Sequence, residues 1–248
     1  MLAQQIQQPV RDIIYRTRGS KGGPITRLVS PSDLGELIKP FVFLDHFDFD
    51  GQDAPMSMEH GWHPHSGIAT VTVVFDGAVG FAETSGKSGV LKAGSVEWMR
   101  AGNGVWHTGA PEPVGVKGFQ LWVALPPELE NAPNASQYVM PEEVPVEGPA
   151  RVILGAYGKS KSPIAAPPMT YLAVSLKAGE AWTLEELRAP DVLKRRTAPT
   201  WAVSGDRLSL RGARRSGTPL RYATVAWATN ALGVSPPWVR RSAPAGEK

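Results

Sequence analysis

Short apolar runs alternate with turn residues through the first half of the chain, and this pattern predicts β-strands. The run at 70–75, Thr-Val-Thr-Val-Val-Phe, is rich in β-branched residues and ends at Asp76-Gly77, a dipeptide typical of hairpin turns. Further short runs, most of them separated by glycine-containing turns, lie at 78–84, 90–92, 95–99, 105–107 and 119–125. Short strands at such spacing are typical of a β-sandwich or barrel, so we expect an all-β fold.

The same pattern suggests two domains. Strand candidates at 24–29 and 41–44 flank one short helical turn at 32–37, and a second β region begins near Arg151. The intervening stretch is rich in Pro and Glu without periodicity, which favours a linker. We therefore predict an N-terminal domain at 1–130, a linker at 131–150 and a C-terminal domain at 151–248.

Composition narrows the possible chemistry. Hydrophobic residues make up 42% of the 248 residues, which is enough for a packed core. The chain has no cysteine, and this excludes disulfides, thiolate ligands and Fe–S clusters. The sequence contains no apolar run of membrane-spanning length and no signal-peptide pattern, so we expect a cytoplasmic protein with no membrane partner.

Charge is distributed unevenly along the chain. Residues 188–248 carry 12 Lys and Arg against three Asp and Glu, whereas the preceding part is acidic overall. The arginine pairs in this basic segment are scattered and belong to no recognisable reading helix, so we do not expect a nucleic-acid partner.

All five histidines lie between His46 and His107, and three of them form a spaced set: His63, His65 and His107. Side chains alternate across a strand, so His63 and His65 would share one face. A neighbouring strand would supply His107. Imidazole is a common ligand of first-row metals, and the set therefore predicts a metal site.

Several motifs, in order, resemble the pirin family of bicupins in the cupin superfamily. They lie at 23–27, 41–47, 63–72, 94–99, 101–107 and 120–126. The resemblance extends over about residues 10–185. It implies two cupin domains of the jelly-roll β-sandwich or barrel type, with one divalent non-haem metal ion in the N-terminal domain. Fe is the expected ion, and Ni, Cu, Co, Mn or Zn are alternatives.

The family's metal ligands are three histidines and a glutamate, and the resemblance transfers the histidines to His63, His65 and His107. The position of the glutamate, two residues after the third histidine, is Gly109 here. A second acidic residue expected four residues after His65 is Ala69. A carboxylate would act as an anionic ligand or as a base, and neither Gly nor Ala has one. Metal binding is therefore expected, whereas catalysis is left open and no base is assigned.

Three functions follow from this reading. The first is a dioxygenase of the quercetin 2,3-dioxygenase type, acting on a small planar aromatic substrate such as a flavonol. The second is a non-catalytic, metal-dependent and redox-sensing regulatory protein that binds a protein partner. The third is a β-sandwich that holds no metal and keeps relic histidines.

The other histidines, two glutamates and the tryptophans near the motifs are not expected to be metal ligands. We interpret His46 and His60 as structural or surface residues. Glu97 either faces solvent or holds a ligand imidazole, and Glu59 is a weaker candidate of the same kind. The tryptophans near the motifs are expected in the core rather than around a pocket; they are Trp62, Trp98, Trp106 and Trp122.

The resemblance fades after about residue 187, where Arg, Ala, Pro and Ser dominate. A shifted reading frame and true divergence both explain this change, so the second cupin is expected to be divergent or incomplete. A hairpin at 202–210 and a strand at 224–228 are still predicted there.

Overall fold

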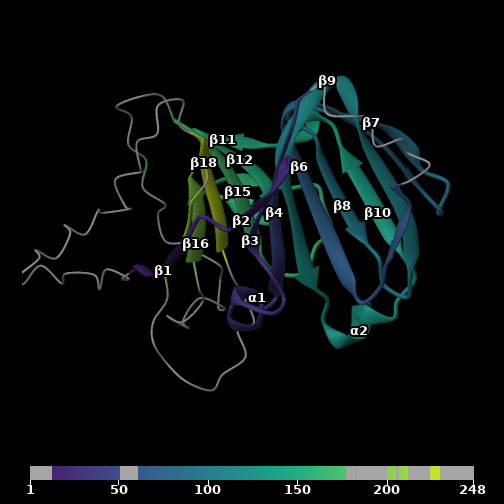
Figure 1. The fold of residues 1–248 in the computed structure, drawn as a ribbon, viewed down its shortest axis with the longest axis horizontal. Coiled ribbons are helices and arrows are strands. Elements are labelled where there is room, and N and C mark those ends of the chain that lie inside the picture. Colours follow the sequence, from purple (N-terminus) through teal and green to yellow (C-terminus); the bar gives the residue numbers. More distant parts are fainter. Residues whose placement is uncertain are drawn as a thin grey trace, which may run out of the picture.

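Two β-sheets stand face to face in the protein (Figure 1). The computed structural model describes residues 13–50, 61–176, 182, 200–204, 207–211 and 224–229. Within these ranges the helical elements are α1 (Leu34–Leu37), α2 (Pro127–Glu130) and the 3-10 turn η1 (Pro141–Glu143). The all-β prediction is therefore confirmed, and α1 is the short helical turn expected at 32–37. None of the helices in the described ranges is long and apolar enough to cross a membrane.

The larger sheet holds nine strands: β2 (Ser20–Gly22), β3 (Ile25–Val29), β4 (Phe41–Phe49), β5 (His63–His65), β6 (Ile68–Glu83), β7 (Ser88–Lys92), β8 (Val96–Arg100), β9 (Val105–Ala124) and β10 (Ala135–Val139). Their order is β10-β8-β6-β9-β4-β3-β2, while β5 pairs with β9 and β7 pairs with β6. Every pairing in this sheet is antiparallel.

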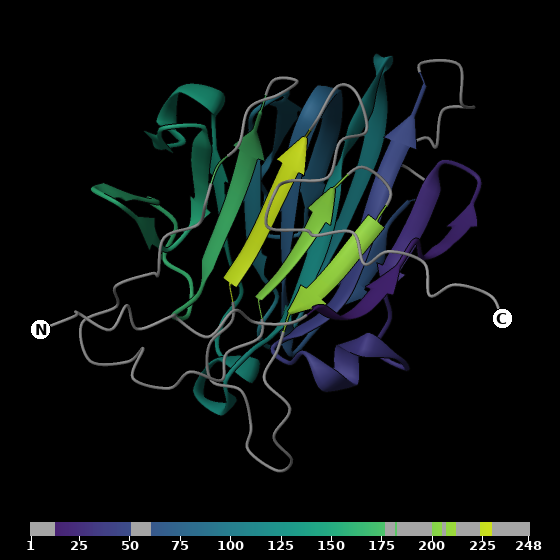
Figure 2. The same cartoon turned by 90° about the vertical axis from the view of Figure 1, so that its left-hand side faces the viewer.

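The smaller sheet holds seven strands: β1 (Ile13–Thr17), β11 (Val146–Glu147), β12 (Ala150–Leu154), β15 (Thr170–Ser175), β16 (Thr200–Ser204), β17 (Arg207–Arg211) and β18 (Thr224–Thr229). Figure 2 shows this sheet in front of the larger one, with β18 in yellow beside β15. A separate two-stranded ribbon, β13 (Ala156–Tyr157) and β14 (Ser160–Lys161), is hydrogen-bonded to β11 through Ser160.

The expected C-terminal strands are present. β16 and β17 form the antiparallel hairpin predicted at 202–210, and β18 is the strand predicted at 224–228. β18 runs parallel to both β15 and β16. β1 pairs with β17, so a strand from near the N-terminus completes the C-terminal sheet.

The predicted hairpin at Asp76-Gly77 is wrong. β6 continues through this dipeptide to Glu83, and the register against β9 shifts on either side of it. Gly77 has φ +69°, and a Cβ at this position would lie 2.0 Å from the Gly115 carbonyl oxygen. The glycine therefore serves a β-bulge that bends a long strand, and the second half of β6 then runs beside β9 as far as His107.

The range 131–150, interpreted as a linker, contributes strands to both sheets. β10 pairs with β8 in the larger sheet, and β11 pairs with β12 in the smaller one. These residues are therefore part of the sandwich, and the domain limits themselves stay a prediction.

A shared hydrophobic core lies between the two sheets. Val71 and Val73 of β6 are buried in the same cluster as Leu154 of β12 and Tyr171 of β15. Each fully buried aliphatic side chain of this kind stabilises the fold by roughly 1.5–3 kcal/mol. Since side chains alternate along β6, Thr70 and Thr72 project from the opposite face of the larger sheet, and the candidate site lies on that face.

Candidate metal centre

Strands β5 and β9 bring the three predicted histidines together. His63 lies directly opposite His107 in the β5–β9 register, and His65 follows two residues later on the same face of β5. One ring nitrogen from each histidine lies within 4.8 Å of the others. The cluster predicted from the sequence spacing is therefore present in the fold.

The ring orientations fit a bound cation. His63 Nδ1 contacts the Gly61 carbonyl oxygen at 2.7 Å, an arrangement in which Nδ1–H donates and Nε2 carries a free lone pair. His63 Nε2 and His107 Nε2 lie 3.0 Å apart. Two nitrogen ligands about 2.1 Å from one ion and about 90° apart would have nearly this separation, about 3 Å.

His65 supplies the third donor. Its Nε2 is buried and has no hydrogen-bond partner among the described residues. A buried polar atom without a partner is costly, and a cation among the three rings would satisfy this one. The donor set therefore fits a first-row divalent metal ion.

The burial of the cluster keeps two of its rings neutral. Loss of solvent, with a smaller contribution from the charge of His63, lowers the pKa of His65 to about 4. Burial, followed by repulsion from His63 and His65, lowers the pKa of His107 to about 3. Neutral imidazole is the form that binds metals, so neither ring requires deprotonation at pH 7.

The two family positions that lack an acid differ in their surroundings. Gly109 follows His107 by two residues on β9, so it belongs to the same face of that strand. A Cβ at Gly109 would lie 3.6 Å from its nearest neighbours, the Gly80 carbonyl oxygen and Val79 Cγ2, so a side chain fits there. Ala69, by contrast, is fully buried in the core between the sheets, where a carboxylate would face apolar groups.

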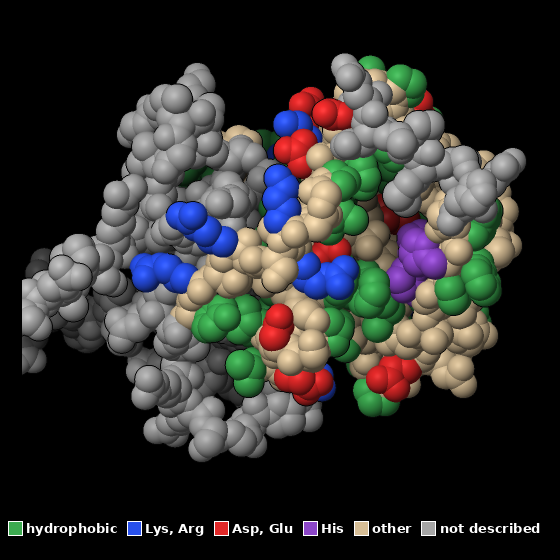
Figure 3. Space-filling view, viewed as in Figure 1, with side chains coloured by type: hydrophobic (Ala, Val, Ile, Leu, Met, Phe, Trp, Pro, Cys, Tyr) green, Lys and Arg blue, Asp and Glu red, His purple; other side chains and the backbone are tan. Residues whose placement is uncertain are grey.

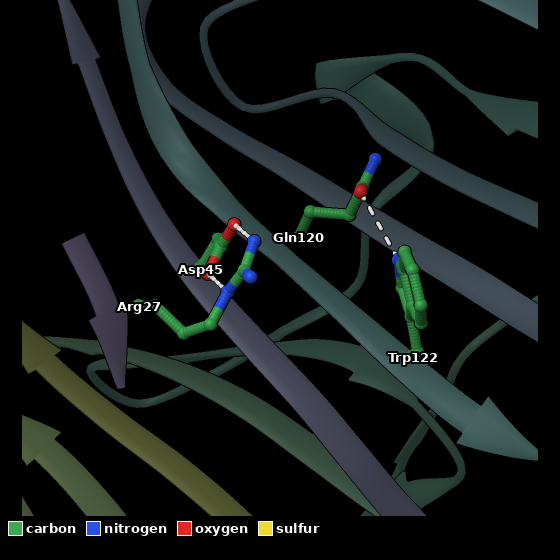
Figure 4. A network of polar contacts seen from close by, with 4 residues as sticks. All are labelled: Arg27, Asp45, Gln120 and Trp122. Carbon is green, nitrogen blue, oxygen red and sulfur yellow. Dashed lines mark hydrogen bonds and ion pairs between the residues drawn. The ribbon is translucent and has the colours of Figure 1, made fainter. Parts of the chain in front are cut away.

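An aromatic stack borders the cluster. The rings of His65 and Trp122 meet edge to face, with centroids 5.0 Å apart, and Trp122 stacks on Phe43 at 4.0 Å. The Arg27 guanidinium lies 4.4 Å from the Phe43 ring centroid and donates two hydrogen bonds of 3.0 Å to Asp45. Figure 4 shows this ion pair near Trp122. Trp122 thus faces the site and is not a core residue.

The other tryptophans have different positions. Trp98 is buried in the core between the sheets, as predicted. Trp62 and Trp106 are wrongly predicted as core residues, because their exposed fractions are 40% and 50%. Trp106 lies opposite Pro64, on the face of β9 that points away from His107.

Histidine side chains reach the surface between hydrophobic side chains on the face shown in Figure 3. His63 is exposed, whereas His65 and His107 are buried. The cluster is therefore reached from solvent on the His63 side.

Glu97 is buried, with an exposed fraction of 4%, so a solvent-facing Glu97 is excluded. Its carboxylate accepts a hydrogen bond from Thr72 Oγ1 at 2.5 Å. Burial raises the pKa of Glu97 to about 7, against the opposing effect of the Thr72 hydrogen bond. Its described hydrogen-bond partner is therefore a hydroxyl group and not an imidazole.

Glu83 is a buried acid that the sequence reasoning missed. It lies opposite His107 in the β6–β9 register, and its Oε2 accepts a hydrogen bond of 2.7 Å from Ser136. Its Oε1 is buried without a partner among the described residues. The unrecognised bend at Gly77 hid this position, because a hairpin there would have separated Glu83 from β9.

His46 has the structural role expected of it. It is partly buried on β4, and its ring packs against Phe119 with centroids 4.9 Å apart. His60 and Glu59 lie outside the described residues.

Part of the chain is similar to known proteins. The family model described as Pirin matches residues 24–123. A pirin-like protein from Caulobacter vibrioides is 34% identical over 146 residues, which is 56% of this chain and 52% of the relative. A Pseudomonas aeruginosa protein, provisionally named a quercetin 2,3-dioxygenase, is 39% identical over 127 residues, 50% of this chain and 44% of the relative.

Among solved structures, quercetin 2,3-dioxygenase from Acinetobacter baumannii superposes with a TM-score of 0.55 at 29% identity. The match covers 64% of this chain and 62% of that one. The chain spans about half the length of the two curated relatives named above.

Proposed function

We propose that this chain, whose residues 24–123 match the family model described as Pirin, binds one divalent non-haem metal ion through Nε2 of His63, His65 and His107. The observation that supports this most strongly is the convergence of the three ring nitrogens within 4.8 Å, with the buried Nε2 of His65 lacking any other partner. Fe is the proposed ion, with Ni, Cu, Co, Mn and Zn as alternatives, because three-histidine sites accept several first-row metals.

The proposed activity is that of a quercetin 2,3-dioxygenase acting on a small planar aromatic substrate of the flavonol type. When bound, the metal would supply a Lewis acid with positions open to substrate oxygens, since three protein ligands leave such positions. The neutral rings of His65 and His107 would hold the ion without losing protons. The Trp122 indole, stacked on the buried Phe43, lies beside His65, and an aromatic ring at this place suits a planar ligand.

Oxygen uptake tests this activity. Fe- or Ni-loaded protein is incubated with quercetin, and oxygen consumption is compared with that of the His107→Ala variant treated in the same way. We expect consumption only with the unaltered chain. Equal rates for the two proteins would contradict the proposal.

A second candidate is a non-catalytic regulatory protein whose metal state changes its binding to a protein partner. Gly109 favours this candidate, because the position that carries the family carboxylate has no side chain. The exposed Trp62 and Trp106 also favour it, since each is the immediate neighbour of a proposed ligand. This function predicts metal-dependent capture of a partner in pull-downs without flavonol turnover.

A further inference from the structure

We propose that Glu97 is a positioning residue for the metal centre, which it influences through Thr72, Gln120 and Trp122. The last member of this series packs against the ligand His65. The inference rests on the proposed metal-binding function and adds to it a residue distant from the ion.

The register of the larger sheet places six polar residues in one row. The row crosses β3, β4, β9, β6, β8 and β10 through Arg27, Asp45, Gln120, Thr72, Glu97 and Tyr138, each paired with the next. Paired residues of neighbouring strands project from the same face of a sheet. Since Val71 and Val73 face the core between the sheets, this row lies on the opposite face of the larger sheet, the face that carries the histidines.

Hydrogen bonds run along part of this row in a single direction. Trp122 Nε1–H donates to Gln120 Oε1 at 3.1 Å. Gln120 Nε2 in turn donates to Thr72 Oγ1 at 3.5 Å, and the Thr72 hydroxyl donates to Glu97 Oε2. The indole can only donate, and the Glu97 carboxylate can only accept when it is ionised, so above pH 7 the two ends fix the orientation of the groups between them.

Without an acceptor at position 97, the donor-to-acceptor order of these hydrogen bonds would no longer be fixed. The Thr72 hydroxyl could then donate to Gln120 instead, and the Gln120 amide would flip to accept that bond. The flip would place the amide nitrogen against the indole N–H of Trp122, a donor against a donor. Asp45 is already engaged in two hydrogen bonds with Arg27 (Figure 4).

The fixed Trp122 indole in turn limits the orientation of the proposed metal ligand His65. One face of its indole stacks on Phe43, and the His65 ring meets the indole edge to face at an angle of 74°. His63 is oriented by its own hydrogen bond to the Gly61 carbonyl. The His65 ring, which carries the proposed ligand atom Nε2, packs directly against the Trp122 indole, so a displaced indole would displace this ring.

Two substitutions interrupt the chain of hydrogen bonds at different points. Glu97→Leu removes the final acceptor and Thr72→Val removes the central hydroxyl, while Glu97→Gln keeps an oxygen that can face Thr72. Val71→Ala is the matched control, because Val71 precedes Thr72 on β6 but points into the core between the sheets. It lowers stability without touching the polar row.

Two measurements distinguish an effect on the position of His65 from a general loss of stability. The first is the ¹H–¹⁵N indole resonance of Trp122 in metal-free protein, assigned with a Trp122→Phe variant. The second is the affinity for Ni(II), measured by competition with a chelator. We expect Glu97→Leu and Thr72→Val to shift the resonance and weaken Ni(II) binding about 10- to 100-fold, the range typical of residues that orient metal ligands. Glu97→Gln and Val71→Ala should stay within about twofold of the unaltered chain.

The outcomes distinguish this inference from the function on which it rests. Failure of the unaltered chain to bind Ni(II) at the histidines would overturn both. Normal Ni(II) binding that is unchanged in Glu97→Leu and Thr72→Val would overturn the role of Glu97 alone. Equal weakening by Val71→Ala would do the same, since the effect would then follow stability and not the hydrogen-bonded row.

Discussion

His63 and His107 lie directly opposite each other on β5 and β9, with their Nε2 atoms 3.0 Å apart. Two neutral ring nitrogens at this distance both present lone pairs unless a proton or a cation lies between them. The pKa of His107 is lowered to about 3, so at pH 7 this ring is neutral and carries one N–H, on either Nδ1 or Nε2. The pair therefore suits either a hydrogen bond between the two rings or two ligands of one metal ion, and the buried Nε2 of His65 beside it favours the metal ion.

Gly109→Glu should tighten metal binding. The position belongs to the same face of β9 as His107 and has room for a side chain, so a carboxylate there would add an anionic ligand. We expect affinity for Ni(II) to rise about tenfold or more in chelator competition. Gly109→Gln is the matched control, with the same length and no charge; equal affinities for the two variants would show that the carboxylate does not reach the ion.

The stability of metal-free protein should carry a pH dependence that Glu97→Gln removes. Burial raises the pKa of Glu97 to about 7 in the folded state, above its usual value of 4.5. Between these values the folded state holds a proton that the unfolded state has lost, so the contribution of Glu97 is present below pH 4.5 and is lost as pH rises through 7. The loss is on the order of 3 kcal/mol across that range.

Urea unfolding at pH 5 and pH 8 tests this. From pH 5 to pH 8 the free energy of unfolding of the unaltered chain should fall relative to that of Glu97→Gln, because only the unaltered chain loses the contribution of the Glu97 proton. Parallel changes in both proteins would mean that Glu97 titrates at an ordinary pKa.

Ser136→Ala should destabilise the fold. The Ser136 hydroxyl donates to Glu83 Oε2, and Glu83 Oε1 is already buried without a partner. Removing the donor leaves the carboxylate less solvated, at a cost of about 1–3 kcal/mol in the free energy of unfolding. Ser32→Ala, at an exposed position, serves as the control and should change stability by less than about 0.5 kcal/mol. A Ser136→Ala protein as stable as this control would contradict the prediction.

Local patterns predicted the strands and the histidine cluster well. The His63-Pro64-His65 spacing fixes both rings on one strand face, and this depends only on side-chain alternation. The face of a strand that points inward is harder to predict, because a one-residue change in register reverses it. Glu97 and Trp122 were placed wrongly for this reason, since only their pairing with neighbouring strands shows that they lie on the face that carries the histidines.

Long-range pairing was the other source of error. Nothing in the local sequence of β1 indicates that it joins β17, almost two hundred residues away. Likewise, the Pro-rich composition around β10 concealed a strand that extends the larger sheet beside β8. The Asp76-Gly77 dipeptide has the composition of a hairpin, but the close approach of Gly115 makes it a bulge.

Metal content is the most direct test of the central claim. Protein purified without a histidine tag is loaded with Fe(II) or Ni(II), desalted and analysed for metal, beside His63→Ala, His107→Ala and the control His46→Asn. The account predicts about one equivalent per chain in the unaltered protein and in His46→Asn, and only traces in the other two variants. A trace in the unaltered protein, or an undiminished equivalent in His63→Ala and His107→Ala, would contradict it.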